Sequence, residues 1–488
     1  MRYTISEILT NTSGYIFYQN PEYDVQAQYN LCAVSVFLKP DEYQNTVFIP
    51  IKIYINNALT ETFFTIEKYI KAGIRSFMFD QVRFEDKKYY HYLMSIIEQY
   101  RDSIDLIIMV PDTLGAIFDM ANYTRCCKMS KSVKYLAVTG SIGKTSTTEM
   151  IYGILKRKFK IYRGEPCVNI KLRIAHKFLE TDADIDYLLF ECSGQTRGYL
   201  KYFSELIMPD AAIITKVSGE NIGEYKTLAN LAKEKSTLLC AMSGDSFAVL
   251  NGMDVLKNES KNYDCVKKYI NEGDYELVKS DKSGSEFIYN NEKYYIPVVG
   301  LHQIDNAIRV IELSKYLGIS NKDIYEGLKN YEAVGNRWVV DKFNGAAEFI
   351  TDCPNNPSYD TIISNIDTFL NLYKDAKYKR IIITRIKSLG DFEEQTYLNL
   401  AEYISALAIQ ELVCVGSEIR IIRDYVKSHS DIKVVWFEKP VKIDENDELI
   451  KYLLSSLDFE QATLLKGQRK DGNIGYGTVK DVLRKILR

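Results

Sequence analysis

The residues best suited to chemistry stand together in the segment Thr139-Gly140-Ser141-Ile142-Gly143-Lys144-Thr145-Ser146. Its two glycines permit a tight backbone turn that directs N–H groups at an anion. The ammonium of Lys144 would neutralise the β and γ phosphates of a nucleotide, and the Thr145 hydroxyl would be a ligand of Mg²⁺. We therefore predict a solvent-facing triphosphate loop, whose candidate ATP-binding residues are Gly140, Ser141, Gly143, Lys144, Thr145 and Ser146.

The elements on either side of this loop fit the same chemistry. An apolar strand, Tyr135 to Thr139, precedes it, and the helix that follows carries Met150, Ile151, Ile154 and Leu155 on one face. The helix would present its positive N-terminus to the phosphates. The common nucleotide loop has four residues between its glycines, whereas here only Ser141 and Ile142 separate them. A chance glycine turn before Lys-Thr is the alternative, and the surrounding strand and helix favour nucleotide binding.

Three series of elements follow one another along the chain. Short apolar strands recur within 1–132, within 133–333, and again after Arg337, separated by segments of helical periodicity. Strands that are apolar throughout indicate parallel sheets covered on both faces. We predict an α/β protein with an N-terminal substrate-binding α/β domain, a central ATP-binding P-loop domain with a parallel sheet and a C-terminal Rossmann-like ligase domain, at residues 1–132, 133–333 and 334–488.

Composition excludes several other classes of protein. The 488 residues are 46% hydrophobic and 26% charged, with a net charge of -3, so a nucleic-acid partner is not expected. The N-terminus lacks a signal-peptide pattern, and no stretch of about 20 apolar residues predicts a membrane span. Nine cysteines occur without a CxxC pair, as in reduced proteins. We expect a cytoplasmic protein, and we predict no oligomeric state.

Further segments, together with the short loop, resemble the Mur ligase family. Phe190-Glu191-Cys192-Ser193 resembles its strand-end glutamate, and Ala232-Lys233-Glu234-Lys235 resembles the stretch of its modified lysine. Gly300-Leu301-His302-Gln303-Ile304-Asp305-Asn306-Ala307 resembles the G-x-H-N-x-x-N-A segment. Asn336-Arg337, Asp352-Cys353-Pro354-Asn355-Asn356-Pro357 and Lys466-Gly467-Gln468-Arg469 match later motifs, the last one being similar to the KGSR of the MurF branch. The resemblance covers about Val133 to Arg469.

The resemblance implies a set of cofactors and roles. The cofactors would be ATP and two Mg²⁺ ions, with Lys144, Glu191 and Lys235 as catalytic residues and Lys235 carbamylated. Thr145, Glu191 and Asn221 would bind metal, Asn306 would face the adenine, Arg337 would reach a phosphate and Asp352 would meet the ribose. A small-molecule carboxylate would be activated as an acyl phosphate and then joined to an amine or amino acid, with release of ADP and phosphate. Asn169, Lys466 and Arg469 are candidate substrate contacts.

The sequence departs from the family pattern at two places. Asn221 stands where family members place a histidine that binds metal, and an asparagine offers only a carbonyl oxygen. The N-terminal region lacks the Asp-Ser-Arg and Asp-Gly segments that bind the UDP-sugar in MurF-like proteins. These departures leave open whether the carboxylate substrate is UDP-linked.

Three alternatives compete with a MurF-like amide ligase. The first is a nucleotide-binding subunit of weak catalytic power, which Asn221 favours. The second is a glutamate ligase similar to folylpolyglutamate synthase. The third is a P-loop kinase, which would have a four-residue gap in its loop and no third domain after Arg337.

Overall fold

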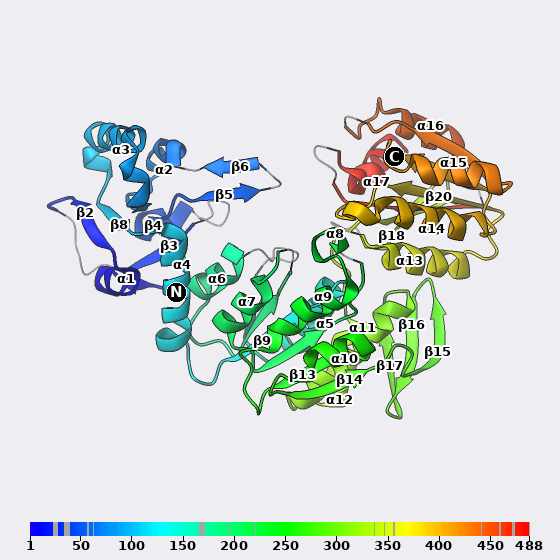
Figure 1. The fold of residues 1–488 in the computed structure, drawn as a ribbon, viewed down its shortest axis with the longest axis horizontal. Helices are drawn as coiled ribbons and strands as arrows, with labels where there is room; N and C mark the ends of the chain where they lie inside the picture. The colour runs from blue at the N-terminus through cyan, green and yellow to red at the C-terminus, as the bar shows by residue number, and fades with distance from the viewer. Residues whose placement is uncertain are drawn as a thin grey trace. The chain divides into compact units, whose positions relative to one another are not determined.

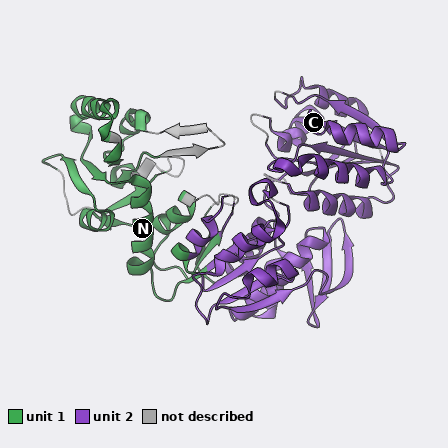
Figure 2. Ribbon diagram, viewed as in Figure 1, with its two compact units in different colours: residues 1–135, 159–190, 205–208 green, residues 136–158, 191–204, 209–488 purple. Residues whose placement is uncertain are grey.

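The computed structural model describes most of the chain and divides it into two compact units (Figure 2). Unit 1 contains residues 1–135, 159–190 and 205–208, and unit 2 contains residues 136–158, 191–204 and 209–488. The described residues are 1–22, 28–33, 40–55, 58–61, 63–164, 171–194, 196–219, 221–335, 337–345, 347–354, 357–440, 442–457, 460–470 and 474–487.

Unit 1 is built on a six-stranded sheet (Figure 1), in the order β1-β3-β4-β7-β8-β2. The pairs β3–β4, β4–β7 and β7–β8 are parallel, while β1 and β2 pair antiparallel at the two edges. Apolar side chains of the helices and strands, such as Phe63, Ile66 and Leu93, pack together against one face of the sheet. The strands are β1 (Tyr3–Thr4), β2 (Tyr15–Gln19), β3 (Gln28–Cys32), β4 (Thr46–Phe48), β7 (Ser76–Asp80) and β8 (Leu106–Val110).

The remaining elements of unit 1 are helices, a hairpin and a short parallel pair. The hairpin is formed by β5 (Lys52–Ile55) and β6 (Ala58–Glu61), and the parallel pair by β10 (Ile161–Tyr162) and β11 (Tyr187–Glu191). Glu191, the last residue of β11, belongs to unit 2. The helices are α1 (Ile5–Thr12), α2 (Ile66–Lys71), α3 (Lys87–Gln99), α4 (Thr113–Tyr123) and α6 (Lys171–Glu180).

The first part of unit 2 has four parallel strands at its centre, and the loop after Thr139 follows the first of them in the chain. The pairs β9–β12, β12–β13 and β13–β14 are all parallel, and an antiparallel sheet of β15, β16 and β17 lies beside α11. The strands are β9 (Lys134–Thr139), β12 (Ala211–Ile214), β13 (Phe247–Asn251), β14 (Val266–Ile270), β15 (Glu276–Asp281), β16 (Gly284–Tyr289) and β17 (Glu292–Ile296). The helices are α5 (Lys144–Leu155), α7 (Tyr199–Ile207), α8 (Ile222–Tyr225), α9 (Leu228–Ser236), α10 (Asp254–Ser260), α11 (Leu301–Tyr316) and α12 (Asn321–Lys329).

The last part of unit 2 is a six-stranded sheet with helices on both faces (Figure 1), in the order β18-β19-β23-β20-β21-β22. Residues of α13, α14 and α15 pack on one face, and residues of α16 and α17 pack on the other. The strands are β18 (Val339–Phe343), β19 (Ala347–Asp352), β20 (Tyr378–Thr384), β21 (Glu411–Val415), β22 (Lys433–Phe437) and β23 (Gln461–Lys466). The helices are α13 (Tyr359–Leu372), α14 (Glu393–Ser405), α15 (Arg420–His429), α16 (Glu448–Ser456) and α17 (Val479–Leu487).

The chain order of this last sheet creates a switch point between β23 and β20. These neighbours continue into helices on opposite faces of the sheet. Gly467 follows β23 at this point, and a Cβ atom there would lie 1.9 Å from Thr384 Oγ1. The amide of Gln468 donates to the same hydroxyl at 3.2 Å. The close approach of the two strand ends explains why a glycine follows Lys466.

Strands are confirmed around the loop and in the last sheet, and β9 begins one residue before the expected strand from Tyr135 to Thr139. The helical segments expected within 133–333 include α11 and α12. The antiparallel strands β15–β17 were not predicted. These strands carry many polar residues, so they lack the continuous apolar run that marks a buried strand.

Candidate nucleotide site

The loop between β9 and α5 is pressed against two neighbouring elements. Gly140 has a φ of +136°, and a Cβ atom there would lie 1.9 Å from Thr215 Oγ1. Gly143 has a φ of +89°, and a Cβ atom there would lie 2.4 Å from Asn306 Nδ2 of α11. Only glycine fits both the backbone angles and the available space.

Backbone hydrogen bonds fix the middle of the loop. The amides of Ser141 and Ile142 donate to the carbonyl of Lys216, which follows β12, at 2.9 and 3.2 Å. The N–H groups in the first turn of α5 have no acceptor within the helix, and they lie at its positive end. The donors left for an anion are therefore those in the first turn of α5, rather than the amides of Ser141 and Ile142.

Lys144 begins α5, and its side chain folds back over the loop. Its ammonium donates to the carbonyls of Gly140 and Ser141 at 2.9 and 3.0 Å. The residue is 9% exposed, so the expectation that Lys144 faces solvent is wrong. The physical reason is that the loop carbonyls attract the ammonium and hold the side chain against the backbone. The same ammonium is within the loop that would surround a phosphate.

Thr145, Glu191 and Arg337 meet at the start of α5. The Thr145 hydroxyl donates to Glu191 Oε1 at 3.1 Å and accepts from Arg337 Nη2 at 3.1 Å. Arg337 Nη1 also donates to Ser146 Oγ at 3.4 Å. Three residues from distant parts of the sequence thus meet at the end of the loop of residues 140–144, which we call the phosphate loop. A buried carboxylate beside a hydroxyl offers the oxygen ligands that Mg²⁺ prefers, with phosphate oxygens completing the shell.

The residues predicted for a second metal lie on α8 and α9. Asn221 precedes α8 with a φ of +57°. Lys235 lies in α9 and is 1% exposed. Its neighbour Glu234 accepts from the amides of Gly198 and Leu200 at 3.0 and 3.2 Å, so that carboxylate holds the start of α7. Within the described residues no three His, Cys, Asp or Glu side chains are grouped to hold a metal. The roles of Asn221 and Lys235 remain predictions.

A pocket opens beside the loop, with an empty volume of about 570 Å³ including the solvent at its mouth. Four of its residues, His302, Asp305, Asn306 and Arg309, follow the spacing i, i+3, i+4, i+7, which places them on one side of α11. The rest of the lining is formed by Ile142, Lys216, Glu272, Leu301, Asp360, Thr361 and Ser364. The contact of Asn306 with Gly143 places one end of the pocket at the phosphate loop.

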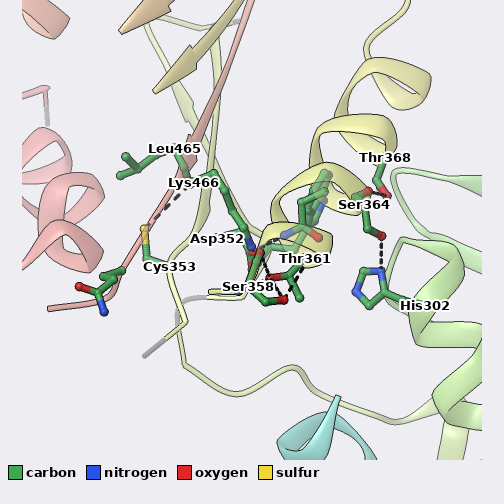
Figure 3. Close-up of polar contacts among 12 residues, drawn as sticks. His302, Asp352, Cys353, Ser358, Thr361, Ser364, Thr368, Leu465 and Lys466 are labelled. Carbon is green, nitrogen blue, oxygen red and sulfur yellow. Dashed lines mark hydrogen bonds and ion pairs between the residues drawn. The ribbon is translucent and has the colours of Figure 1, made fainter. Parts of the chain in front are cut away.

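His302 and Asp305 are among the ionisable groups of the pocket whose pKa values are shifted. Burial lowers the pKa of His302 to about 4, and its Nδ1 lies 3.0 Å from Ser364 Oγ of α13 (Figure 3). Burial raises the pKa of Asp305 to about 6 against the opposing effect of a hydrogen bond from the Gly273 amide, at 3.1 Å. Near neutral pH, His302 is therefore neutral and Asp305 is ionised.

Asp352 and Lys466 form a buried ion pair at the carboxyl ends of β19 and β23 (Figure 3). Asp352 also accepts from Asn365 Nδ2 and from the amide of Trp338. It does not line the pocket described above, and its predicted contact with a ribose remains a prediction. The ammonium of Lys466 is held by Asp352, whereas Arg469 is exposed, so Arg469 is the more accessible of the two predicted substrate contacts. Asn169 lies outside the described residues.

Sequence reasoning assigned no role to the charged residues of the pocket, which are Lys216, Glu272, Asp305, Arg309 and Asp360. The available signal was the helical spacing of polar residues in a segment that is otherwise apolar. A buried helix normally has apolar residues on the faces that pack. His302, Asp305, Asn306 and Arg309 interrupt that pattern on one side of α11.

The comparisons with known proteins agree with the geometry of this site. The model of the Mur ligase middle domain matches residues 138–313. The UDP-N-acetylmuramoyl-tripeptide–D-alanyl-D-alanine ligase of Borreliella burgdorferi is 26% identical over 359 residues, which are 69% of this chain and 72% of that protein.

Two solved structures share the fold. MurF from Acinetobacter baumannii superposes with a TM-score of 0.78 at 18% identity, over 100% of this chain and 99% of that one. MurF from Thermotoga maritima, solved in complex with ADP, has a TM-score of 0.71 at 16% identity, over 93% and 96% of the two chains. The predicted resemblance and the predicted three-domain fold class are confirmed, while the limits at 132/133 and 333/334 remain predictions. In the described part of the chain, no helix is long and apolar enough to cross a membrane.

Proposed function

We propose that this chain, which belongs to the Mur ligase family, is an ATP-dependent ligase that joins a carboxylate to an amine through an acyl phosphate. The observation that carries the proposal is the contact of Arg337 with Thr145 and Ser146. Arg337 lies just before β18 of the last sheet, so this sheet contributes a cation to the phosphate loop. The kinase alternative predicts no third series of elements after Arg337, whereas a six-stranded sheet begins there.

The two chemical steps balance as follows. A carboxylate oxygen of the first substrate attacks the γ-phosphorus of ATP, and the bond between that phosphorus and the ADP oxygen breaks. The amine nitrogen of the second substrate then attacks the acyl carbon, loses a proton and displaces phosphate. The products are an amide, ADP and phosphate. Each step builds negative charge that fixed cations can stabilise.

The chain's own residues divide these tasks. Lys144, whose ammonium donates to the Gly140 carbonyl, would bind the β and γ phosphates, and Arg337, which donates to Thr145, would bind the phosphoryl group. Glu191 and Thr145 would hold Mg²⁺, which neutralises phosphate charge. Asn306 would face the adenine in the pocket. Lys235 would take up CO₂ and lose a proton to become an anionic carbamate, and this anion with Asn221 would hold a second Mg²⁺.

The substrates belong to the same proposal. The relatives are named for UDP-N-acetylmuramoyl-tripeptide and D-alanyl-D-alanine, so these compounds are the first pair to test. The proposed reaction uses small molecules that are found in the cytoplasm. Arg469, exposed after the switch point, would bind a substrate carboxylate by charge.

The experiment measures ADP and phosphate release by the purified protein with Mg²⁺ and ATP. We expect release only when a carboxylate and an amine are both present, across a panel that includes the pair named above and amino acids with folate-type acceptors. The Lys144→Ala variant serves as the blank for contaminating ATPase. Phosphate release that needs only one substrate, or none, would contradict a ligase. Nucleotide binding without turnover on the whole panel would instead favour a binding subunit.

A further inference from the structure

The pocket beside the phosphate loop contains an arginine whose burial is unusual. Arg309 is 1% exposed, and its Nε and Nη2 atoms have no hydrogen-bond partner among the described residues. Burial lowers the pKa of its guanidinium. Two unpaired N–H nitrogens on a buried guanidinium are costly to the fold, even with the charges of Asp305 and Glu272 nearby. Such a group is expected where a ligand supplies the missing acceptors.

Asp305 lies one turn before Arg309 on the same side of α11 and offers the complementary group. Its Oδ1 is held by the Gly273 amide, and it makes no other hydrogen bond among the described residues. The second oxygen can therefore accept a hydrogen bond from a ligand. Since the pKa of Asp305 is about 6, its carboxylate is an ionised acceptor at neutral pH.

Two of the other charged residues of the pocket are already paired, because Lys216 lies 3.0 Å from Glu272, which also accepts from Asn251 Nδ2 at 3.4 Å. Asp360 lines the pocket from α13. The amide Nδ2 of Asn306 has no partner among the described residues, and this side chain lies against Gly143 of the loop. On the same side of α11, Arg309 and Asp305 add a donor and an acceptor to the pocket.

We propose that Asp305 and Arg309 read the edge of the nucleobase and make this pocket selective for a 6-amino purine over a 6-oxo purine. The inference rests on the proposed binding of a nucleoside triphosphate at the loop. A 6-amino purine presents a donor, the amino group, beside an acceptor ring nitrogen. Asp305 accepts from the amino group, and Arg309 donates to the ring nitrogen.

Asp305 is the residue that excludes the competing base. An arginine alone favours guanine-type bases, because its two donors match O6 and N7. With Asp305 beside it, the O6 atom of a 6-oxo purine would face an ionised carboxylate, and two acceptors cannot form a hydrogen bond. Replacing the carboxylate by an amide would supply a donor for O6 and remove this exclusion.

Binding of ADP and of inosine diphosphate, with Mg²⁺ and by calorimetry, tests the inference. For the unmodified protein we expect ADP to bind about 10- to 100-fold more tightly than inosine diphosphate. Asp305→Asn should lower this ratio at least about tenfold by gaining affinity for inosine diphosphate. Arg309→Met should weaken both ligands. The matched surface controls Asp254→Asn and Arg157→Met should leave the ratio unchanged, since both side chains are exposed.

The outcomes separate the inference from the function on which it rests. An unchanged ratio in Asp305→Asn, or an unchanged affinity for both nucleotides in Arg309→Met, overturns the inference alone, provided that the unmodified protein binds ADP. Failure of the unmodified protein to bind either nucleotide overturns the proposed function as well. Both variants should fold, because asparagine retains the acceptor for Gly273 and methionine replaces a buried charge with an apolar chain. Thermal unfolding checks this, and a variant that unfolds is replaced by Asp305→Ser or Arg309→Leu in the same assay.

Discussion

Replacement of Lys144 by alanine separates the catalytic role of this residue from its structural role. The ammonium makes two hydrogen bonds, to the carbonyls of Gly140 and Ser141 at 2.9 and 3.0 Å, in a side chain that is mostly buried. Hydrogen bonds to charged groups contribute about 1.5–3 kcal/mol each, but water can reach Ser141, so we expect a total loss of about 1–3 kcal/mol. A domain of ordinary stability, about 5–15 kcal/mol, remains folded after such a loss.

The catalytic loss should be much larger than this structural effect. Removal of one preorganised donor from a developing charge typically lowers kcat by about 10²- to 10³-fold. We therefore expect phosphate release to fall by at least about 10²-fold in Lys144→Ala while urea unfolding shows a folded protein. Lys156→Ala is the matched control, because Lys156 follows the same helix, is exposed, and has its ammonium over the Tyr152 ring.

The unfolding free energy and kcat are measured on the same preparations. Activity of Lys144→Ala within about tenfold of the unmodified protein would refute the assignment of Lys144 to the phosphates. An activity loss matched by an equal loss in Lys156→Ala would show that α5, rather than the ammonium, was disturbed.

Four further changes have distinct expected results. Lys235→Ala should lose activity, and millimolar formate or acetate should partly restore it. The control Lys233→Ala, at an exposed neighbouring residue, should keep full activity without these anions. Full activity of Lys235→Ala would show that no carbamate acts in the site. Arg337→Lys keeps the charge but loses the planar group that contacts both Thr145 and Ser146. We expect kcat to fall about 10²-fold with little change in stability. An unchanged kcat would argue against a role of these contacts in catalysis. The folded state raises the pKa of Asp305 from 3.8 to about 6. Between these two pH values, Asp305 is protonated in the folded protein and ionised in the unfolded chain. Stability should therefore fall by up to about 3 kcal/mol as the pH rises through this window, and chemical unfolding of Asp305→Asn should lack that fall. Glu411→Gln leaves the buried Arg380 without its counter-charge and should cost about 3–5 kcal/mol in urea unfolding, compared with almost nothing for the exposed Glu445→Gln.

The parts of the molecule that could be predicted from the sequence are those determined by residues close to one another in the chain. The strand before Gly140, the helix after Gly143 and the apolar strands of the last sheet follow from periodicity and from glycine geometry, and the structure has them at the expected places. Glu191 at the carboxyl end of a strand also follows from this logic, because parallel sheets bind ligands at that edge.

The parts that were missed depend on contacts between distant residues. The burial of Lys144 results from carbonyls that fold back over it. The pairing of Lys466 with Asp352 joins strands that are 114 residues apart in the chain. Arg309 and Asp305 could be recognised only once α11 was seen to line a pocket, because in the sequence they read as ordinary charges on a helix.

Transfer of oxygen from the carboxylate substrate to phosphate tests the proposed acyl phosphate most directly. The carboxylate that supports turnover, with UDP-N-acetylmuramoyl-tripeptide as the first candidate, is labelled with ¹⁸O and incubated with the protein, Mg²⁺, ATP and the amine. We predict one ¹⁸O atom in the released phosphate for each amide formed, measured by mass spectrometry. Amide formation with unlabelled phosphate, or with release of AMP and pyrophosphate, would contradict the mechanism.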